Sequence, residues 1–161
     1  MDCSSKKAIL RTRLLTLRGA LKPVAILEKS RKITEKVLVQ KNLSGKDRIL
    51  IYLPIGSEVD TLGLIKYFFK TKKRLFLPSY KKEWHMREFK NFENLEDGPY
   101  GTRQPRGKRV NIDDIDLSIL PAVAFTKGGA RLGYGRGVYD KLLARSTSYK
   151  LGLCFDLQLI D

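Results

Sequence analysis

The sequence predicts an α/β protein with a largely parallel central sheet. Short apolar runs rich in β-branched and aromatic residues recur along the chain, and stretches with a helical spacing of apolar residues lie between them. Turns that contain glycine or proline separate the two kinds of segment. Strands that alternate with helices are typical of parallel sheets. The length of 161 residues fits one domain, which we expect to span residues 1–161.

The first predicted helix covers residues 5–21. Leucines at steps of four, three and four residues form an apolar stripe along it: Leu10, Leu14, Leu17 and Leu21. Lys7, Arg11 and Arg18 lie off this stripe. A second helix begins at Pro23, where the missing N–H costs nothing, and runs to about Gln40. Its apolar face consists of Ile26, Ile33 and Val37.

The middle of the chain alternates strand and helix. Residues 48–55 form an apolar run rich in β-forming residues and predict a buried strand. Residues 56–60 follow as a loop, and residues 61–73 predict a third helix. Residues 74–80 predict the next strand, and the alternation in residues 84–89 predicts a partly exposed strand.

The last third of the chain begins with residues 90–116, which are polar and contain glycine and proline. We expect a long irregular segment there. Residues 117–125 predict another buried strand, followed by a turn at residues 126–130. Residues 135–146 predict a loop that leads into a helix, and residues 150–155 predict the final strand.

The charge of the chain is strongly basic. The net charge is +15, and residues 1–50 hold 13 Lys or Arg against 4 Asp or Glu. A basic surface attracts nucleic acid, an acidic membrane or polyanionic small molecules. Charge alone does not choose among these partners, and a solvated face that aids solubility explains it equally well.

The composition excludes several classes of protein. No apolar run reaches about 18 residues, so no transmembrane helix is expected. The N-terminus has no uninterrupted apolar segment of the secretory type, and we expect a cytoplasmic protein. Cys3 and Cys154 lie far apart in the sequence, so neither a disulfide framework nor a zinc site is predicted.

A glycine-rich stretch, RLGYGRGVYDKLL, occupies residues 131–143. Gly133, Gly135 and Gly137 allow backbone N–H groups to approach an anion, and Arg131 and Arg136 add positive charge. A helix that begins near Val138 would point its positive end at that anion. The stretch matches neither a Walker A sequence nor a dinucleotide fingerprint, because its spacing is Gly-x-Gly-x-Gly and no strand is expected directly before it. Phosphate binding and a structural turn both remain open.

Two carboxylates are candidates for a site. Asp140 follows the glycine stretch, where a carboxylate suits Mg²⁺ bound to phosphate, or else stabilises the first turn of a helix. Glu58 comes directly after a predicted buried strand, at the end where open α/β sheets bind ligands. It can accept paired hydrogen bonds from an amino-pyrimidine-like ring, and it can equally be a surface carboxylate.

One basic pair and one histidine complete the candidates. Lys7 and Arg11 are spaced i, i+4 and lie on one helical face, where they can hold phosphates together or form a solvated face. His85 is the single histidine of the chain and is interpreted as structural or exposed. No catalytic triad is indicated.

Four segments of the chain resemble a known family. They are KAILR (7–11), YLPIGSEVDT (52–61), YGTRQP (100–105) and LPAVAFTKGGARLGYGRGVYDKLL (120–143). Together they resemble the 5-formyltetrahydrofolate cyclo-ligase family, whose members are also called methenyltetrahydrofolate synthetases. The last segment is the most specific match and favours the phosphate-binding interpretation of the glycine stretch.

The resemblance implies a three-layer α/β/α fold, Rossmann-like and of NagB/RpiA/CoA-transferase-like topology. It implies ATP-dependent conversion of 5-formyltetrahydrofolate to 5,10-methenyltetrahydrofolate, with ADP and phosphate released, Mg²⁺ required and a phosphorylated formyl (imine-phosphate) intermediate. Such a reaction depends on positioning and charge stabilisation, and needs no protein nucleophile. The implied partner is a small molecule, with or without a polyglutamate tail. A monomer that binds no specific nucleic acid and no membrane is expected.

The resemblance also implies roles for individual residues. The ATP-binding residues are Lys7, Arg11, Arg131, Leu132, Gly133, Tyr134, Gly135, Arg136, Gly137, Val138 and Tyr139. The folate-binding residues are Arg11, Leu53, Glu58, Tyr100, Tyr134 and Arg136. The catalytic residues are Arg136 and Tyr139. The Mg²⁺ ligand is Asp140.

The chain departs from the family pattern in four places. Thr126 and Val138 replace residues that are often Asp or Asn and an aromatic, and Arg136 stands where Lys is usual. Family members usually continue beyond FDLQLID, through a segment with a second carboxylate at the Mg²⁺ site, and we expect that segment to be missing here. This departure leaves open a short form that binds folate or nucleotide without turnover. The net charge of +15 leaves open a second alternative, a basic nucleic-acid-binding module.

Overall fold

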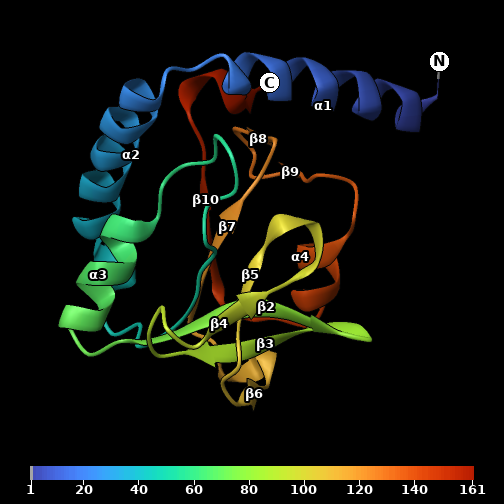
Figure 1. The fold of residues 1–161 in the computed structure, drawn as a ribbon. Coiled ribbons are helices and arrows are strands. Elements are labelled where there is room, and N and C mark those ends of the chain that lie inside the picture. The colour runs from blue at the N-terminus through green and yellow to red at the C-terminus, as the bar shows by residue number, and fades with distance from the viewer. Residues whose placement is uncertain (1) are drawn as a thin grey trace.

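The computed structural model describes residues 2–161, and a six-stranded sheet forms its centre (Figure 1). The strands lie in the order β10-β7-β1-β2-β3-β6. In chain order they are β1 (Arg48–Leu50), β2 (Arg74–Lys81), β3 (Glu83–Phe89), β6 (Arg109–Val110), β7 (Leu117–Pro121) and β10 (Tyr149–Leu153). The pairs β10–β7, β7–β1 and β1–β2 are parallel, and β3 pairs antiparallel with β2 and β6. The prediction of a largely parallel sheet is confirmed, with antiparallel strands at one edge.

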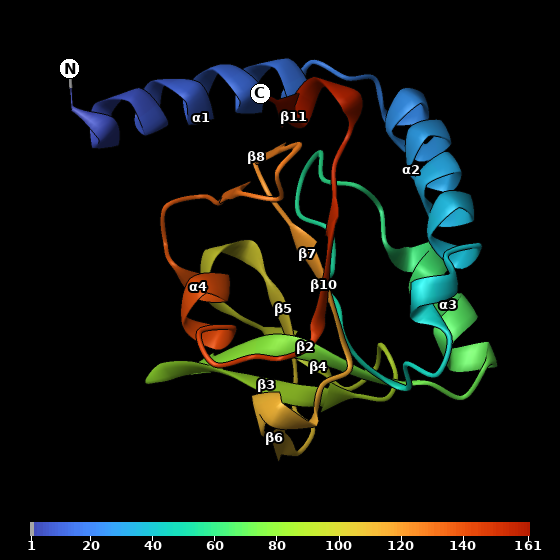
Figure 2. The same ribbon diagram turned by 180° about the vertical axis from the view of Figure 1, so that it is seen from behind.

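Helices cover both faces of this sheet (Figures 1 and 2). α2 (Pro23–Leu38) and α3 (Leu62–Lys70) lie on one face, and the short α4 (Val138–Leu142) lies on the other. Because successive residues of a strand point to opposite faces, Ile49 packs in the apolar cluster of α2 and α3, whereas Leu50 packs in that of α4. The expected three layers are present, with a thin layer at α4. The named topology remains a prediction.

The chain connections reverse between β1 and β7. From β1 the chain passes through α3 to β2, and from β7 it passes through α4 to β10, on the opposite face. Such a reversal is a topological switch point, and open α/β sheets bind ligands there, outside the carboxyl ends of the strands. The fold therefore predicts a ligand site at the carboxyl ends of β1 and β7.

α1 (Cys3–Gly19) lies across this carboxyl-terminal edge (Figure 2). Leu14 is buried and packs in one cluster with Ala124. The predicted apolar stripe is wrong at Leu17, which is 47% exposed, while Arg18 is only 4% exposed. Oxygen acceptors on Ser57, Ala122 and Tyr134 satisfy the Arg18 guanidinium, and this allows a charged residue on the buried face. In residues 2–161 no helix combines the length and apolar character needed to cross a bilayer.

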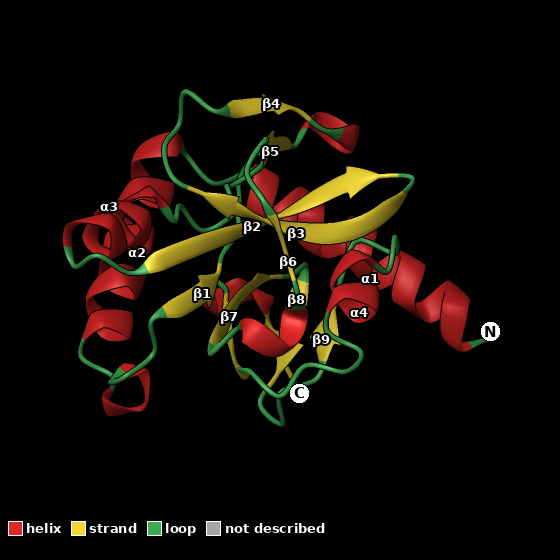
Figure 3. Cartoon of the chain, turned by 90° about the horizontal axis from the view of Figure 1, so that it is seen from below, coloured by secondary structure: helices red, strands yellow, loops and turns green. Residues whose placement is uncertain are grey.

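Two smaller sheets complete the fold. β8 (Ala124–Thr126) pairs antiparallel with β9 (Arg131–Leu132) and parallel with β11 (Leu159–Ile160). β4 (Leu95–Asp97) pairs antiparallel with β5 (Arg103–Pro105), and β5 lies beside the β2–β3 hairpin (Figure 3). The sheet of β8 carries the start of the glycine stretch.

Several predicted elements differ in length from the observed ones. The buried run 48–55 is a strand only at β1, although Ile51 and Tyr52 remain buried. The predicted strand over residues 117–125 divides into β7 and β8, which belong to different sheets. Pro121 has no N–H to donate, which favours the break at this point. The helix expected within residues 135–146 is only the five-residue α4.

β3 is more buried than the partly exposed strand predicted there. His85, Met86 and Phe89 are all buried, and both edges of β3 are paired. Met86 packs in the apolar cluster of α4 on one face, whereas Phe89 packs against Phe69 of α3 on the other. The His85 ring accepts a hydrogen bond from Arg87 Nε at 3.0 Å. The structural interpretation of His85 therefore describes it best.

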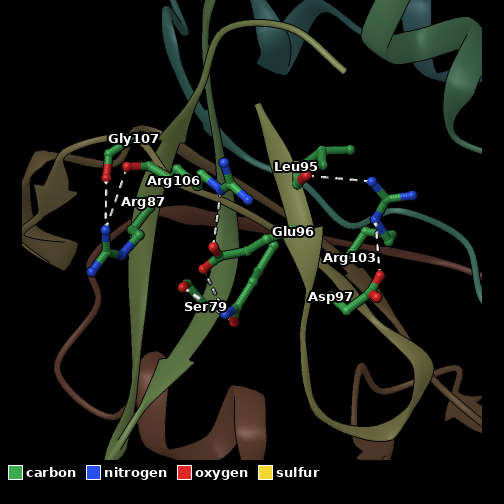
Figure 4. A network of polar contacts seen from close by, with 9 residues as sticks. Ser79, Arg87, Leu95, Glu96, Asp97, Arg103, Arg106 and Gly107 are labelled. Atoms are coloured by element: carbon green, nitrogen blue, oxygen red, sulfur yellow. Dashed lines mark hydrogen bonds and ion pairs between the residues drawn. The ribbon is translucent and has the colours of Figure 1, made fainter. Parts of the chain in front are cut away.

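Residues 90–116, predicted to be irregular, contain β4, β5 and β6, and polar contacts join parts of this segment to one another and to β3 (Figure 4). Arg106 Nε donates to Glu96 Oε2 at 3.0 Å. Arg87 Nη1 donates to the Gly107 carbonyl at 3.1 Å. These contacts fix the position of the segment that carries Tyr100.

Candidate active site

A pocket of about 500 Å³ lies at the switch point, bounded by α1, the segment after β1, the β2–β3 hairpin and the glycine stretch. This volume is typical of small-molecule sites. All residues that the sequence predicts for the site line it: Lys7, Arg11, Leu53, Glu58, Tyr100 and residues 131–140. Segments far apart in the sequence therefore meet at one pocket, as predicted, while the role of each residue stays a prediction.

Glu58 is the buried acid of this pocket, with 4% of its surface exposed. Its Oε2 accepts the N–H of Ile55 at 2.9 Å, and its Oε1 accepts the hydroxyl of Tyr134 at 2.5 Å. Burial raises the pKa of the Glu58 carboxyl, and these two hydrogen bonds and the Arg18 charge oppose that rise. The interpretation as a surface carboxylate is wrong. Two hydrogen bonds fix the Glu58 carboxyl in the pocket wall, where its oxygens can accept further hydrogen bonds from a ligand.

The glycine stretch connects β9 to α4. β9 ends at Leu132, directly before Gly133, so a short strand does precede the loop, contrary to expectation. Gly135 and Gly137 have φ angles of 92° and 65°, which favour glycine because L side chains rarely adopt them. α4 begins at Val138, as predicted. The stretch thus has the backbone of a glycine turn, and this turn faces the pocket.

Two arginines tie the glycine stretch to its surroundings. Arg11 Nε donates to the Gly133 carbonyl at 2.8 Å and so links the loop to α1. The Arg136 guanidinium carbon lies 3.3 Å from the centroid of the Tyr100 ring, a cation–π contact. Tyr100 itself has a φ angle of 63°, unusual for a residue other than glycine. The two contacts bring the predicted phosphate and folate residues together.

Asp140 is the predicted Mg²⁺ ligand, and its carboxylate pairs with Arg131 Nη2 at 2.6 Å. Within residues 2–161 no three His, Cys, Asp or Glu residues gather closely enough to hold a metal ion. Mg²⁺ is commonly held by one or two carboxylates together with phosphate oxygens. Asp140 fits that pattern as the single protein carboxylate when a nucleotide supplies the phosphate oxygens. Binding of Mg²⁺ would then require the ion pair between Arg131 and Asp140 to break.

Several residues of the site region had no assigned role in the sequence prediction. Tyr52, Trp84 and Arg103 line the pocket, and Arg18 lies behind it, with Nη2 donating to Tyr134 at 2.7 Å. Arg18 was open to detection, because it stands seven residues after Arg11 and so shares its helical face. Trp84 lies in a segment without a motif, and Arg103 lies in the family-like segment 100–105 but had no role assigned to it. The folded chain brings both to the pocket.

The raised pKa of Glu58 predicts a specific pH dependence of stability. The folded chain keeps this proton to a higher pH than the unfolded chain, so stability falls as pH rises from the ordinary glutamate pKa through the raised one. The variant Glu58→Gln lacks this proton. Its free energy of unfolding relative to the native chain is therefore expected to increase with pH across that window. Urea unfolding at a series of pH values measures it, and a difference that stays constant or decreases contradicts the prediction.

The fold and pocket define a doubly wound α/β protein with a small-molecule site at the switch point of its sheet. The model of the 5-formyltetrahydrofolate cyclo-ligase family matches residues 3–161, and the chain belongs to this family. Family membership favours the enzyme over the nucleic-acid-binding alternative.

Named relatives and solved structures agree with this assignment. The mouse 5-formyltetrahydrofolate cyclo-ligase is 30% identical, over 97% of this chain and 85% of the relative. The structure of 5,10-methenyltetrahydrofolate synthetase from Aquifex aeolicus matches with a TM-score of 0.86 and 32% identity, covering 95% of this chain and 79% of that one. The corresponding structure from Mycoplasma pneumoniae matches with a TM-score of 0.78 and 26% identity, covering 100% and 90%.

Proposed function

We propose that the protein converts 5-formyltetrahydrofolate to 5,10-methenyltetrahydrofolate, using ATP and releasing ADP and phosphate. One observation carries the proposal: a single pocket joins a buried carboxylate, Glu58, to a basic glycine loop with Arg131 and Arg136. The first group suits an amino-pyrimidine ring, and the second suits phosphates. The relatives named above support the pairing of these two ligands.

At the folate end, Glu58 accepts hydrogen bonds from the amino-pyrimidine part of the pterin. Each of its oxygens already accepts one hydrogen bond from the protein and has capacity for another. Leu53 packs against the ring, and Tyr100 packs on the rest of the folate. The ring is thereby oriented so that its formyl group faces the glycine loop.

At the phosphate end, the formyl oxygen attacks the γ-phosphate of ATP and ADP leaves. The N10 nitrogen then attacks the carbon of the resulting imine phosphate and loses its proton, and phosphate leaves with the oxygen that came from the formyl group. Lys7, Arg11 and Arg131 bind the phosphates, and Arg136 stabilises the charge on the transferred group. Tyr139 lies beside the reacting atoms. Burial raises the pKa of this phenol, so it stays a neutral hydrogen-bond donor.

Mg²⁺ bound between Asp140 and the phosphates would neutralise charge on the nucleotide. The substrate is proposed to carry one glutamate or a polyglutamate tail, and the protein to act as a cytoplasmic monomer. Light scattering at micromolar concentration tests the monomer.

Arg136 gives a prediction that separates charge from geometry. Arg136→Ala is expected to lower kcat by about a hundredfold, because a donor to the developing charge is lost. Arg136→Lys keeps the charge and should retain most of the activity. Steady-state kinetics of both variants measure the effect, with Lys141→Ala, outside the pocket lining, as the control. Equal losses in the Ala and Lys variants would show that charge at this position is not what matters.

The proposed function is tested by the near-ultraviolet absorbance of 5,10-methenyltetrahydrofolate. Folded protein with 5-formyltetrahydrofolate, ATP and Mg²⁺ should form the product, and omission of ATP should prevent it. Calorimetry with each ligand accompanies the assay. Binding of folate or nucleotide without product would favour the alternative of a short form that does not turn over. Absence of both binding and product would contradict the proposal.

A further inference from the structure

Arg18 is a buried cation whose role is not explained by direct contact with a ligand. Its side chain is 4% exposed, and it is not part of the pocket lining. None of the ion pairs found in residues 2–161 includes it. Burying a guanidinium is costly unless its donors are well used, so the contacts of Arg18 indicate what it does.

The Arg18 guanidinium joins three segments that surround the pocket. Its Nε donates to Ser57 Oγ at 3.1 Å, in the loop after β1. Its Nη1 donates to the carbonyl of Ala122 at 3.2 Å, directly beyond β7. Its Nη2 donates to the hydroxyl of Tyr134 at 2.7 Å, in the glycine stretch. The Arg18 side chain therefore links the loop that carries Glu58 to the glycine stretch and fixes their relative position.

The contact with Tyr134 also fixes the direction of a hydrogen-bond chain. A guanidinium donates and does not accept, so the Tyr134 oxygen accepts from Arg18 and directs its own proton to Glu58 Oε1 at 2.5 Å. The other oxygen of Glu58 faces the N–H of Ile55, which also only donates. Both oxygens of Glu58 are thus held as acceptors, which is the arrangement of an ionised carboxylate.

We propose that Arg18 is a positioning residue that acts through Tyr134 to keep Glu58 an ionised acceptor aimed into the pocket. This inference rests on the proposed function, in which Glu58 holds the amino-pyrimidine ring of the substrate. An ionised carboxylate accepts paired N–H donors from such a ring, whereas a protonated carboxyl directs one of its own protons at them. Arg18 thereby controls substrate binding without touching the substrate.

The surroundings of Glu58 support this assignment. The groups that face it are the Arg18 cation and the phenols of Tyr52, Tyr134 and Tyr139. Burial raises the pKa of all three phenols, so they remain neutral and Arg18 supplies the positive charge. Removal of that charge leaves the effect of burial on the Glu58 carboxyl less opposed.

The titration of Glu58 in the ligand-free full chain tests the inference directly. Carboxyl-selective ¹³C NMR is recorded against pH for the native chain, Arg18→Met, Tyr134→Phe and the control Arg13→Met, which changes an exposed arginine of the same helix. The Glu58 midpoint is expected to rise by about one pH unit in Arg18→Met, to rise in Tyr134→Phe, and to stay unchanged in the control. Native midpoints in both Arg18→Met and Tyr134→Phe would overturn the proposal.

Two further measurements keep the outcome clear. If Arg18→Met does not fold, Tyr134→Phe decides, because Tyr134 is 42% exposed and its ring is retained. In the turnover assay, the acid limb of the kcat/KM profile should move to higher pH in both variants and not in Arg13→Met. A native chain without turnover contradicts the proposed function, while the carboxyl titration still decides the role of Arg18.

Discussion

Glu58→Ala is expected to reduce ATP-dependent turnover of 5-formyltetrahydrofolate by about a thousandfold, because the variant removes the acceptor that orients the pterin. A site built to hydrogen-bond its ligand loses far more than one that makes only apolar contact, since the ligand donors are left unpaired in a buried pocket. Glu58 is 4% exposed, so water does not easily replace it. Steady-state kinetics at saturating ATP measure the loss in kcat/KM.

Comparison with two further variants shows what causes the loss of activity in Glu58→Ala. Glu58→Gln keeps an acceptor for the N–H of Ile55 and the volume of the side chain but removes the charge, so its activity is expected to lie between those of the native chain and Glu58→Ala. Glu93→Ala removes an exposed carboxylate outside the pocket and should leave activity unchanged. Circular dichroism confirms that each variant is folded. A folded Glu58→Ala variant with native kcat/KM would refute the pterin contact.

The sequence predicted α2 and the strands β2 and β3 closely, but not the points at which other apolar runs leave the sheet. α2 is observed within two residues of its predicted end, because the spacing of Ile26, Ile33 and Val37 reports directly on burial against the sheet. Apolar runs, in contrast, do not show where backbone pairing stops. The run after Leu50 stays buried but leaves the sheet, and the run around Pro121 passes from one sheet to another.

The candidate site was predictable where a local motif marked it. The glycine stretch, the basic pair of α1 and the loop that carries Glu58 each had a recognisable pattern, and the resemblance to one family joined them before any geometry was known. Arg18 shares a helical face with Arg11, but it had no role in the prediction because the stripe of leucines made the neighbouring Leu17 the more natural buried residue. The contact of Arg136 with Tyr100 depends on a segment of short strands whose position no sequence pattern specifies.

Gly107→Ala is expected to destabilise the fold by about 3 kcal/mol, because there is no room for a side chain between β5 and β6. A Cβ at this position would lie 2.1 Å from the carbonyl oxygen of Glu88 and 3.0 Å from its carbonyl carbon. Both atoms belong to the backbone of β3, which is paired on both edges and is not free to move away. The carbonyl of Gly107 itself accepts a hydrogen bond from Arg87 (Figure 4). Displacement of the segment around Gly107 would therefore also break this hydrogen bond to β3.

Thermal unfolding should show this effect as a fall in Tm of roughly 6–12 °C for a chain of this size. Gly19→Ala is the matched control, since a Cβ at Gly19, at the end of α1, meets nothing within 4 Å. Its Tm should stay the same or rise slightly, because alanine restricts the unfolded chain and favours the helix. If Gly107→Ala unfolds at the native Tm, β6 and the turn before it separate from β3 at little cost. The position of Tyr100 would then depend on Arg136 rather than on the sheet.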